Sequence, residues 1–248
     1  MAFTAETLAG RVFVISGAAR GLGAAQARAI VDAGGQVVLG DVDADGVAEL
    51  AHTLGRSAVA VKLDVTDEGQ WAETALAANA LGTVGGLVNN AGVFGGGSAI
   101  DTDLDDFRTV QQVNVEGSLL GIRAIAPLLR AAGGGSIVNI SSIAGLIGIC
   151  DRVAYVTAKW AVRGLTKSAA LDLGRWGIRV NSVHPGRIET PFIDGLGASV
   201  LPNQIIREPG RPDDISGLVV FLLSAASRFS TGSEFIADGG RYVGEFRG

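Results

Sequence analysis

Short apolar runs alternate with longer amphipathic stretches along the chain. Seven runs have the composition of buried strands, and they lie at 11–16, 36–40, 58–63, 86–89, 136–140, 178–183 and 234–237. Strands that are apolar at consecutive positions, rather than at every second one, are typical of parallel sheets covered on both faces. The pattern therefore predicts an α/β fold with one parallel sheet of about seven strands.

The amphipathic stretches between these runs predict helices on both faces of the sheet. They lie between Gly23 and Gly34 and at 44–54, 68–80, 105–129, 153–175 and 212–225. Such an alternation is typical of a doubly wound, Rossmann-type fold. Because the sequence shows no linker, repeat or low-complexity tract, we expect residues 1–248 to form a single domain.

The turn after the first strand is rich in glycine. It reads Gly17-Ala18-Ala19-Arg20-Gly21-Leu22-Gly23 and leads directly into a helix. Glycines allow the backbone to approach a pyrophosphate, and the amino terminus of a helix favours its negative charge. Strand, glycine turn and helix together predict a dinucleotide-binding site.

Asp41 ends the second strand, where folds of this kind place the acidic residue that binds the ribose of NAD. A carboxylate there accepts hydrogen bonds from the ribose diol and repels the 2′-phosphate of NADP. Arg20 could pair with such a phosphate, but we rank Asp41 above it and predict NAD as the cofactor. The alternative for Asp41 is a cap on the end of its strand.

Besides Ser16 and Asp41, four further candidate residues fall at the carboxyl ends of predicted strands, where parallel sheets bind ligands. They are Asp64, Asn90, Ser142 and Pro185. Asn90-Ala91-Gly92 is typical of a turn whose backbone lies close to a ligand. Asn114 lies in the middle of a predicted helix, where asparagine is unfavourable. Its side chain has either a functional role or a local hydrogen bond.

Tyr155 and Lys159 lie one turn apart on the same face of the predicted helix 153–175. An ammonium beside a phenol favours the phenolate and lowers the tyrosine pKa towards working pH. A tyrosine with such a pKa takes a proton from an alcohol or donates one to a carbonyl. The pair by itself is also compatible with a plain surface contact.

Composition narrows the class of protein. The net charge of −5 argues against nucleic acid or an anionic membrane as the main partner. No apolar run is long enough to span a membrane, and residues 1–10 do not resemble a signal peptide. Cys150 is the only cysteine, so no intramolecular disulfide forms and we expect a cytoplasmic protein. With so few histidines and cysteines, we expect no metal site.

Together these motifs resemble the short-chain dehydrogenase/reductase family over nearly the whole chain. The motifs are the glycine turn 17–23, Asp64-Val65, Asn89-Asn90-Ala91-Gly92, Asn114, Ser142, Tyr155 with Lys159, Pro185-Gly186 and Asp238-Gly239-Gly240. Ser16 departs from the threonine that is usual in the family but keeps the hydroxyl. The resemblance implies an NAD-dependent oxidoreductase.

The same resemblance implies residue roles. Tyr155 is the general acid or base, Lys159 lowers its pKa and binds the nicotinamide ribose, and Ser142 donates to the substrate oxygen. Asn114 holds a water that connects Lys159 to solvent. The implied cofactor-binding residues are Gly17, Arg20, Gly21, Leu22, Gly23, Asp41, Asp64, Val65, Asn90, Ala91, Gly92, Tyr155, Lys159, Pro185, Gly186, Ile188 and Thr190.

Within the family, the runs 19–23, 134–142, 162–167 and 181–186 are similar to bacterial 3α/20β-hydroxysteroid dehydrogenases. These residues belong mostly to the scaffold or the cofactor site. The resemblance therefore says little about the substrate. The leading hypothesis is an apolar secondary alcohol or ketone, such as a hydroxysteroid or a cyclic or aryl alcohol. One alternative is a 3-oxoacyl-acyl-carrier reductase, against which Asp41 and the net charge argue. Another is a non-catalytic dinucleotide-binding protein, which would lack Tyr155, Lys159 or Ser142.

We expect the substrate to contact the loops 93–100, 144–153 and 187–206, with a lid at about 187–208. Apolar candidates in these loops are Phe94, Leu146, Ile149, Phe192 and Ile193, which either line the pocket or pack the lid on the core. Family members use the helices 105–129 and 153–175 for one dimer interface and the last strand and tail for another. The resemblance therefore implies a homotetramer.

Overall fold

The computed structural model describes residues 4, 6–190 and 204–244. They form a seven-stranded parallel sheet with the strand order β3-β2-β1-β4-β5-β6-β7, which confirms the predicted Rossmann-type α/β fold. Part of the predicted lid, including Phe192 and Ile193, lies outside the described residues.

The strands are β1 (Val12–Ser16), β2 (Gln36–Asp41), β3 (Ala58–Lys62), β4 (Val84–Asn89), β5 (Gly135–Ile140), β6 (Ile178–Pro185) and β7 (Glu234–Ala237). The helices are α1 (Gly21–Asp32), α2 (Ala44–Leu54), α3 (Glu68–Leu81), α4 (Leu104–Gln111), α5 (Gly117–Ala131), α6 (Val153–Leu173) and α7 (Pro212–Leu223). The carboxylates of Asp43, Asp67 and Asp103 accept backbone N–H groups where α2, α3 and α4 begin. These caps explain why the helices begin close to their predicted bounds.

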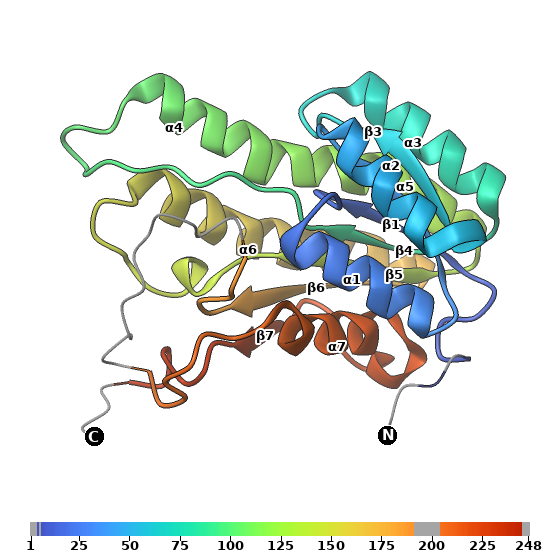
Figure 1. Ribbon diagram of the computed structural model, residues 1–248. Helices are drawn as coiled ribbons and strands as arrows, with labels where there is room; N and C mark the ends of the chain where they lie inside the picture. The colour runs from blue at the N-terminus through green and yellow to red at the C-terminus, as the bar shows by residue number, and fades with distance from the viewer. Residues whose placement is uncertain (1–3, 5, 191–203, 245–248) are drawn as a thin grey trace.

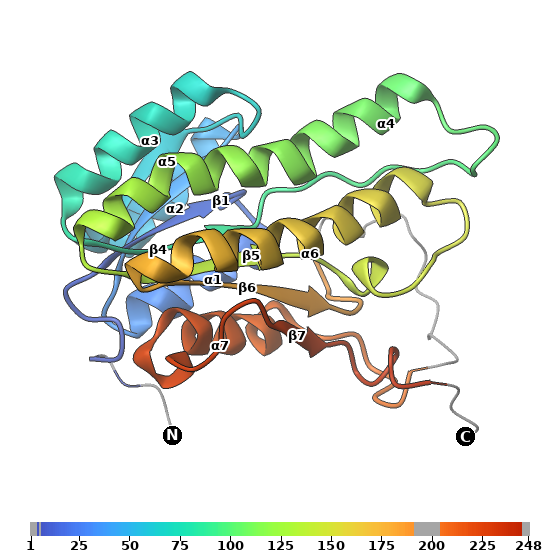
Figure 2. The same ribbon diagram turned by 180° about the vertical axis from the view of Figure 1, so that it is seen from behind.

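Helices cover both faces of the sheet. Along β1, Phe13 and Ile15 belong to the apolar core beneath α1, α2 and α7 (Figure 1). Val12 and Val14 belong to the core beneath α3, α5 and α6 (Figure 2). Because successive side chains of a strand point to opposite faces, a strand between two helical layers is apolar at every position.

The predicted helix 105–129 is helical throughout, but it is not an α-helix along its whole length. α4 and α5 are joined by a π-helical turn at Gln112–Glu116, and Asn114 lies in it. Its side-chain Nδ2 donates to the carbonyl oxygens of Val93, at 3.0 Å, and Val110, at 2.9 Å. Such turns inside helices are frequent at functional sites because they redirect side chains.

The carboxyl ends of the strands point towards the loops that hold the predicted site residues. α4, the loop before it and the start of α6 extend beyond this edge of the sheet (Figures 1 and 2). In sheet order, Asp64 follows β3, Asp41 ends β2, Gly17 follows β1, Asn90 follows β4, Ser142 follows β5 and Gly186 follows β6. The sheet order thus brings residues that are far apart in sequence to one edge.

Candidate active site

A cavity of about 640 Å³ runs along the carboxyl edge of the sheet. Ser142 and all the predicted cofactor-binding residues except Gly23 line it. Gly23 is buried behind the wall, where an added Cβ atom would lie 2.8 Å from Asn90 Nδ2. This glycine is therefore required for close packing of the turn rather than for ligand contact, a correction to its predicted role.

Hydrogen bonds between β1 and β4 hold the glycine turn in place. The Ser16 hydroxyl accepts the backbone N–H groups of Asn90 and Ala91, each at 3.1 Å. Asn90 Nδ2 in turn donates to the carbonyl oxygens of Ser16, at 3.1 Å, and Gly17, at 2.9 Å. Gly17 has φ +68° and no room for a Cβ atom, which would lie 2.7 Å from the Ala91 Cα. Ser16 and Asn90 therefore shape the turn at which α1 begins.

Asp41 both caps this turn and faces the cavity. Its Oδ2 accepts from the backbone N–H of Ala19 and its Oδ1 from that of Asp43, each at 3.0 Å. A carboxylate has about four acceptor sites, so two remain for a ligand. The cap and the ribose-binding role, which sequence analysis treats as alternatives, are thus compatible.

These residues fit a nicotinamide dinucleotide. The glycine turn and the start of α1 offer backbone N–H groups of the kind that bind a pyrophosphate. Arg20, the N-cap residue of α1, makes no side-chain capping bond to this helix. Asp41, at the end of the neighbouring strand β2, lines the same cavity and has free lone pairs that can accept hydrogen bonds from a ribose diol.

Tyr155, Lys159 and Ser142 converge in the middle of the cavity wall. The Lys159 ammonium donates to the Ile140 carbonyl oxygen at 3.0 Å and lies 5.5 Å from the centre of the Tyr155 ring. The side chains of Tyr155 and Ser142 are hydrogen-bonded. Tyr155 is 7% exposed and Lys159 4%, so the pair is not a plain surface contact.

Burial shifts the pKa values of both residues of the pair. It raises the pKa of the Tyr155 phenol to about 12, although the hydrogen bond with Ser142 opposes the rise. It lowers the pKa of the Lys159 ammonium to about 8. The prediction of a lowered tyrosine pKa is therefore wrong for the protein alone, because desolvation of the phenolate outweighs the nearby ammonium.

Asn114 lies behind the wall, beside Lys159. An added Cβ atom on Gly92 would lie 2.6 Å from Asn114 Oδ1 and 3.5 Å from Lys159 Nζ, so both polar atoms face the same space. Asn114 Oδ1 is buried and has no hydrogen-bond partner among the described residues. The amide nitrogen thus makes the local hydrogen bonds, while the amide oxygen remains available beside the ammonium.

His184 supports Ser142 from the adjacent strand, a contact that the sequence analysis missed. The fully buried imidazole lies 3.0 Å from the Ser142 carbonyl oxygen through Nδ1 and 2.9 Å from the Ser182 hydroxyl through Nε2. Burial lowers the pKa of His184, so the ring is neutral and Nδ1 donates to the carbonyl. The Ser142 hydroxyl itself accepts from the Ala144 N–H at 3.1 Å.

Apolar and basic side chains line the remaining wall. Phe94 and Ile149 line the cavity as predicted, whereas Leu146 does not. The Phe94 ring lies 4.7 Å from the Tyr155 ring, centre to centre. The sequence analysis did not assign Arg187 and Arg241, which also line the cavity. Each lies next to a recognised motif, Pro185-Gly186 or Asp238-Gly239-Gly240, and that position was the available signal.

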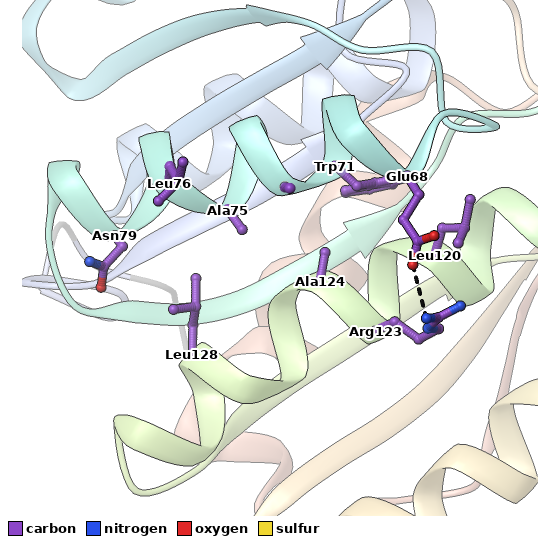
Figure 3. Close-up of a pocket in the computed structure, with 10 residues that line it drawn as sticks. Glu68, Trp71, Ala75, Leu76, Asn79, Leu120, Arg123, Ala124 and Leu128 are labelled. Carbon is purple, nitrogen blue, oxygen red and sulfur yellow. Dashed lines mark ion pairs between the residues drawn. The ribbon is translucent and has the colours of Figure 1, made fainter.

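A second hollow, of about 470 Å³, lies between α3 and α5 (Figure 3). Alkyl side chains such as Leu76, Ala124 and Leu128 form much of its lining. At one end Arg123 and Glu68 form an ion pair at 2.9 Å. Its lining includes none of the predicted site residues, so the chemistry belongs to the cavity at the sheet edge.

Comparison with known proteins identifies the family of the chain. Residues 17–241 match a family model described as enoyl-(acyl carrier protein) reductase. The chain is 43% identical to trans-4-hydroxycyclohexanecarboxylate dehydrogenase of Sinomonas cyclohexanicum, over 98% of this chain and 97% of that protein. It is 46% identical to 3-alpha-(or 20-beta)-hydroxysteroid dehydrogenase of Mycobacterium tuberculosis strain H37Rv, over 96% of this chain and 91% of that protein.

A solved structure agrees as well. A short-chain type dehydrogenase/reductase from Mycobacterium marinum superposes with a TM-score of 0.90 at 34% identity, covering 94% of this chain and 96% of that one. Fold, cavity and relatives lead to one conclusion: the chain belongs to the short-chain dehydrogenase/reductase family and is an oxidoreductase that transfers a hydride between a nicotinamide dinucleotide and an alcohol or ketone.

Proposed function

We propose that the protein is an NAD-dependent dehydrogenase of secondary alcohols carried on a ring. The observation that carries this proposal is the convergence of Tyr155, Ser142 and Lys159 in one cavity that also contains Asp41. The three side chains supply an acid or base, a hydrogen-bond donor and a buried cation. Asp41 lies at the position suited to a ribose diol.

Tyr155 moves the proton. In oxidation its phenolate accepts the proton of the substrate hydroxyl, and in reduction its phenol donates to the carbonyl oxygen. Ser142 donates a hydrogen bond to the same oxygen and stabilises its developing charge. When bound, an oxidised nicotinamide supplies the hydride acceptor and a positive charge that favours the phenolate. Asn114 Oδ1 and Lys159 Nζ face one space, where the amide oxygen would hold a water through which the proton passes between Lys159 and solvent.

The preference for NAD is tested at Asp41. We expect kcat/KM to favour NAD over NADP by about 100-fold, because a like charge against the 2′-phosphate costs several kcal/mol. Asp41→Ser should reduce the ratio of kcat/KM with NAD to kcat/KM with NADP by about tenfold or more. Asp43→Ser is the matched control, since Asp43 caps α2 and does not line the cavity. Absorbance at 340 nm measures both cofactors, and equal values in the parent would refute the assignment.

Two observations support a cyclic substrate: the names of the relatives and the apolar side chains that line the cavity. The two relatives named above are dehydrogenases of a hydroxycyclohexanecarboxylate and of hydroxysteroids. Phe94, Ile149 and Ile188 offer apolar surface to such a ring. An oxidation screen with NAD across cyclic, steroid, aryl and linear secondary alcohols should give the highest kcat/KM for a cyclic one.

A second candidate is a reductase of acyl-carrier thioesters, which the description of the family model favours. Asp41 opposes it, since it disfavours NADP. Faster reduction of acetoacetyl-coenzyme A or of an enoyl-coenzyme A with NADPH than of any cyclic ketone with NADH would establish this candidate and remove the first.

We also propose a cytoplasmic homotetramer. Exposed apolar side chains on α5, α6 and β7 support it: Leu119 is 42% exposed, Trp160 46%, Leu171 85% and Ile236 41%. The sequence suggests six small or apolar interface candidates on these helices, Ala124, Ala126, Ala158, Ala161, Leu165 and Ala169. Three of them, Ala126, Ala158 and Ala169, are buried in the core of the chain itself. In the described part of the chain, no helix has both the length and the apolar character needed to cross a membrane.

A further inference from the structure

Charge is distributed unevenly along the cavity. The two carboxylates of its lining, Asp64 and Asp41, lie at the ends of β3 and β2. Arg187 and Arg241 follow β6 and β7, the two strands at the other end of the strand order. Ser142 follows β5, between these two groups. Arg20, in the glycine turn after β1, also lines the first end, so with Asp41 and Asp64 this end carries a net charge of −1. The other end, beyond the proton-transfer residues, carries the two positive charges of Arg187 and Arg241.

Backbone hydrogen bonds fix the positions of both arginines in the chain fold. Arg187 accepts the Gly210 N–H at 2.9 Å through its carbonyl oxygen, and the Gly210 carbonyl accepts from Glu189 at 2.9 Å. The Asp238 carboxylate accepts the N–H groups on either side of Arg241, from Gly240 at 2.8 Å and Tyr242 at 2.7 Å. These bonds give both side chains a fixed starting point at the cavity wall.

The two segments also lie against each other. The Gly186 N–H donates to the Ala237 carbonyl at 2.9 Å. A Cβ atom added to Gly186 would lie 2.6 Å from the Asp238 Cα. The arginines that follow these two contacts therefore belong to one region of the wall.

Within the described residues, the Arg241 guanidinium makes no ion pair. Asp238, the nearest acid in sequence, accepts backbone N–H groups through both carboxylate oxygens and forms no ion pair with Arg241 in the described part of the chain. Like charges on one cavity wall raise its affinity for an anion. A planar guanidinium with paired N–H donors matches the geometry of a carboxylate.

We propose that Arg187 and Arg241 form a subsite for a carboxylate, so that the substrate is a hydroxy acid with its hydroxyl group at Tyr155 and Ser142. This inference rests on the proposed function and names its substrate class. Adjacent strands lie about 4.8 Å apart, so β6 and β7 are about 5 and 10 Å from β5. A single ring or a short carbon chain bridges that span, with Phe94 and Ile149 against its apolar part.

The test compares one substrate with and without its charge. The probes are trans-4-hydroxycyclohexanecarboxylate and its methyl ester, oxidised with NAD by the parent protein and by Arg187→Gln and Arg241→Gln. We expect kcat/KM of the parent to favour the acid by about tenfold or more. Each substitution should raise KM for the acid about 10- to 100-fold, the range of a lost hydrogen bond to a charged group, and reduce this preference. Arg187→Lys should restore part of it.

Arg175→Gln is the control, since it removes the same charge from a residue that contacts Trp176 rather than the cavity. Calorimetry with cyclohexanecarboxylate, which cannot be oxidised at a hydroxyl, measures anion binding to the protein saturated with NAD. We expect binding to the parent and to Arg175→Gln, and weaker binding to the two cavity variants.

Two results would overturn the inference. One is equal use of acid and ester by the parent, and the other is weaker binding of NAD, rather than of the carboxylate, by the arginine variants. The second result would assign the arginines to the cofactor. The proposed function fails separately, if neither the acid, the ester nor any other secondary alcohol is oxidised. In that case calorimetry still tests the carboxylate subsite.

Discussion

At the scale of the residue, the proposed mechanism makes turnover depend on Tyr155. Tyr155→Phe removes the hydroxyl but keeps the buried ring against Phe94. We expect turnover to fall by about 100-fold or more, as is typical for loss of a general acid or base, while NAD binding survives. Fluorescence titration with NADH and steady-state rates measure the two effects. A variant that binds the cofactor and retains the parent rate would show that another group moves the proton.

The raised Tyr155 pKa predicts how the two directions respond to pH. Oxidation needs the phenolate, which is scarce at neutral pH when burial raises the pKa to about 12. The oxidation rate should therefore rise with pH across the working range, while reduction, which needs the phenol, should not. Rates measured in both directions from about pH 6 to 10 test this, and an oxidation rate that falls as pH rises would contradict it.

Lys159 lowers stability at neutral pH, because its charge is buried. Its pKa is about 8 in the folded protein against 10.5 when exposed. Below pH 8, Lys159 is protonated in both the folded and the unfolded protein, so the full cost of burying its charge lowers the free energy of unfolding. Between these values the unfolded state binds more protons, so the free energy of unfolding rises with pH. A shift of this size corresponds to about 3 kcal/mol as an upper bound.

Lys159→Met tests this cost in the protein without cofactor. At pH 7 the variant should be more stable than the parent, and the difference should disappear as pH approaches 10.5. Denaturant unfolding at several pH values measures the difference in the free energy of unfolding between the variant and the parent. The contributions of other titrating groups are the same in both proteins and cancel in this difference. A parent that is the more stable protein at pH 7 would show that bonds such as that to Ile140 outweigh desolvation. The same variant should lose turnover, which illustrates how a functional group is kept at the expense of stability.

At the scale of the element, the contact of α5 with β4 depends on Gly121. A Cβ atom there would meet Asn89 Oδ1 on β4 and would lie 2.8 Å from the Trp71 ring on α3. The ring is buried and its Nε1 donates to the Val65 carbonyl oxygen at 2.9 Å, so it has little freedom to move. Gly121→Ala should destabilise the protein by about 1–3 kcal/mol through overpacking.

Gly217 is the matched control in α7, because an added Cβ would meet no described atom within 4 Å. Gly217→Ala should stabilise the protein by about 0.5–1 kcal/mol, since alanine favours a helix interior. Thermal unfolding of the two variants should therefore shift in opposite directions. Equal shifts would mean that helix propensity, rather than the α5–β4 contact, determines both effects.

At the scale of the whole molecule, the exposed apolar side chains of α6 predict assembly. Light scattering should give four times the monomer mass of 25.2 kDa. Trp160→Glu with Leu171→Glu places charges on the face of α6 and should reduce that mass. Ile100→Glu, at a 97% exposed position in the loop before α4, should leave it unchanged. A parent that elutes as a monomer would refute the tetramer.

Local pattern determined much of this protein. Consecutive apolar residues mark central strands such as β1, because those strands lie between two helical layers. The glycine turn and Asp41 are recognisable because a strand, a turn and a helix follow one another directly in sequence. Tyr155 and Lys159 are recognisable because a helix brings residues four apart to one face. Each of these features depends on neighbours within one or two elements, and the amino-acid sequence alone therefore predicts them.

Tertiary structure decided what depends on burial and on sheet order. The direction of the Tyr155 pKa shift follows from desolvation within the cavity, and the spacing to Lys159 predicts the opposite sign. The π turn at Asn114 follows from its bonds to Val93 and Val110, which the helical period does not show. Arg187 and Arg241 reach one wall only because β6 and β7 are adjacent. Burial and adjacency arise from the packing of distant segments, so no local pattern contains them.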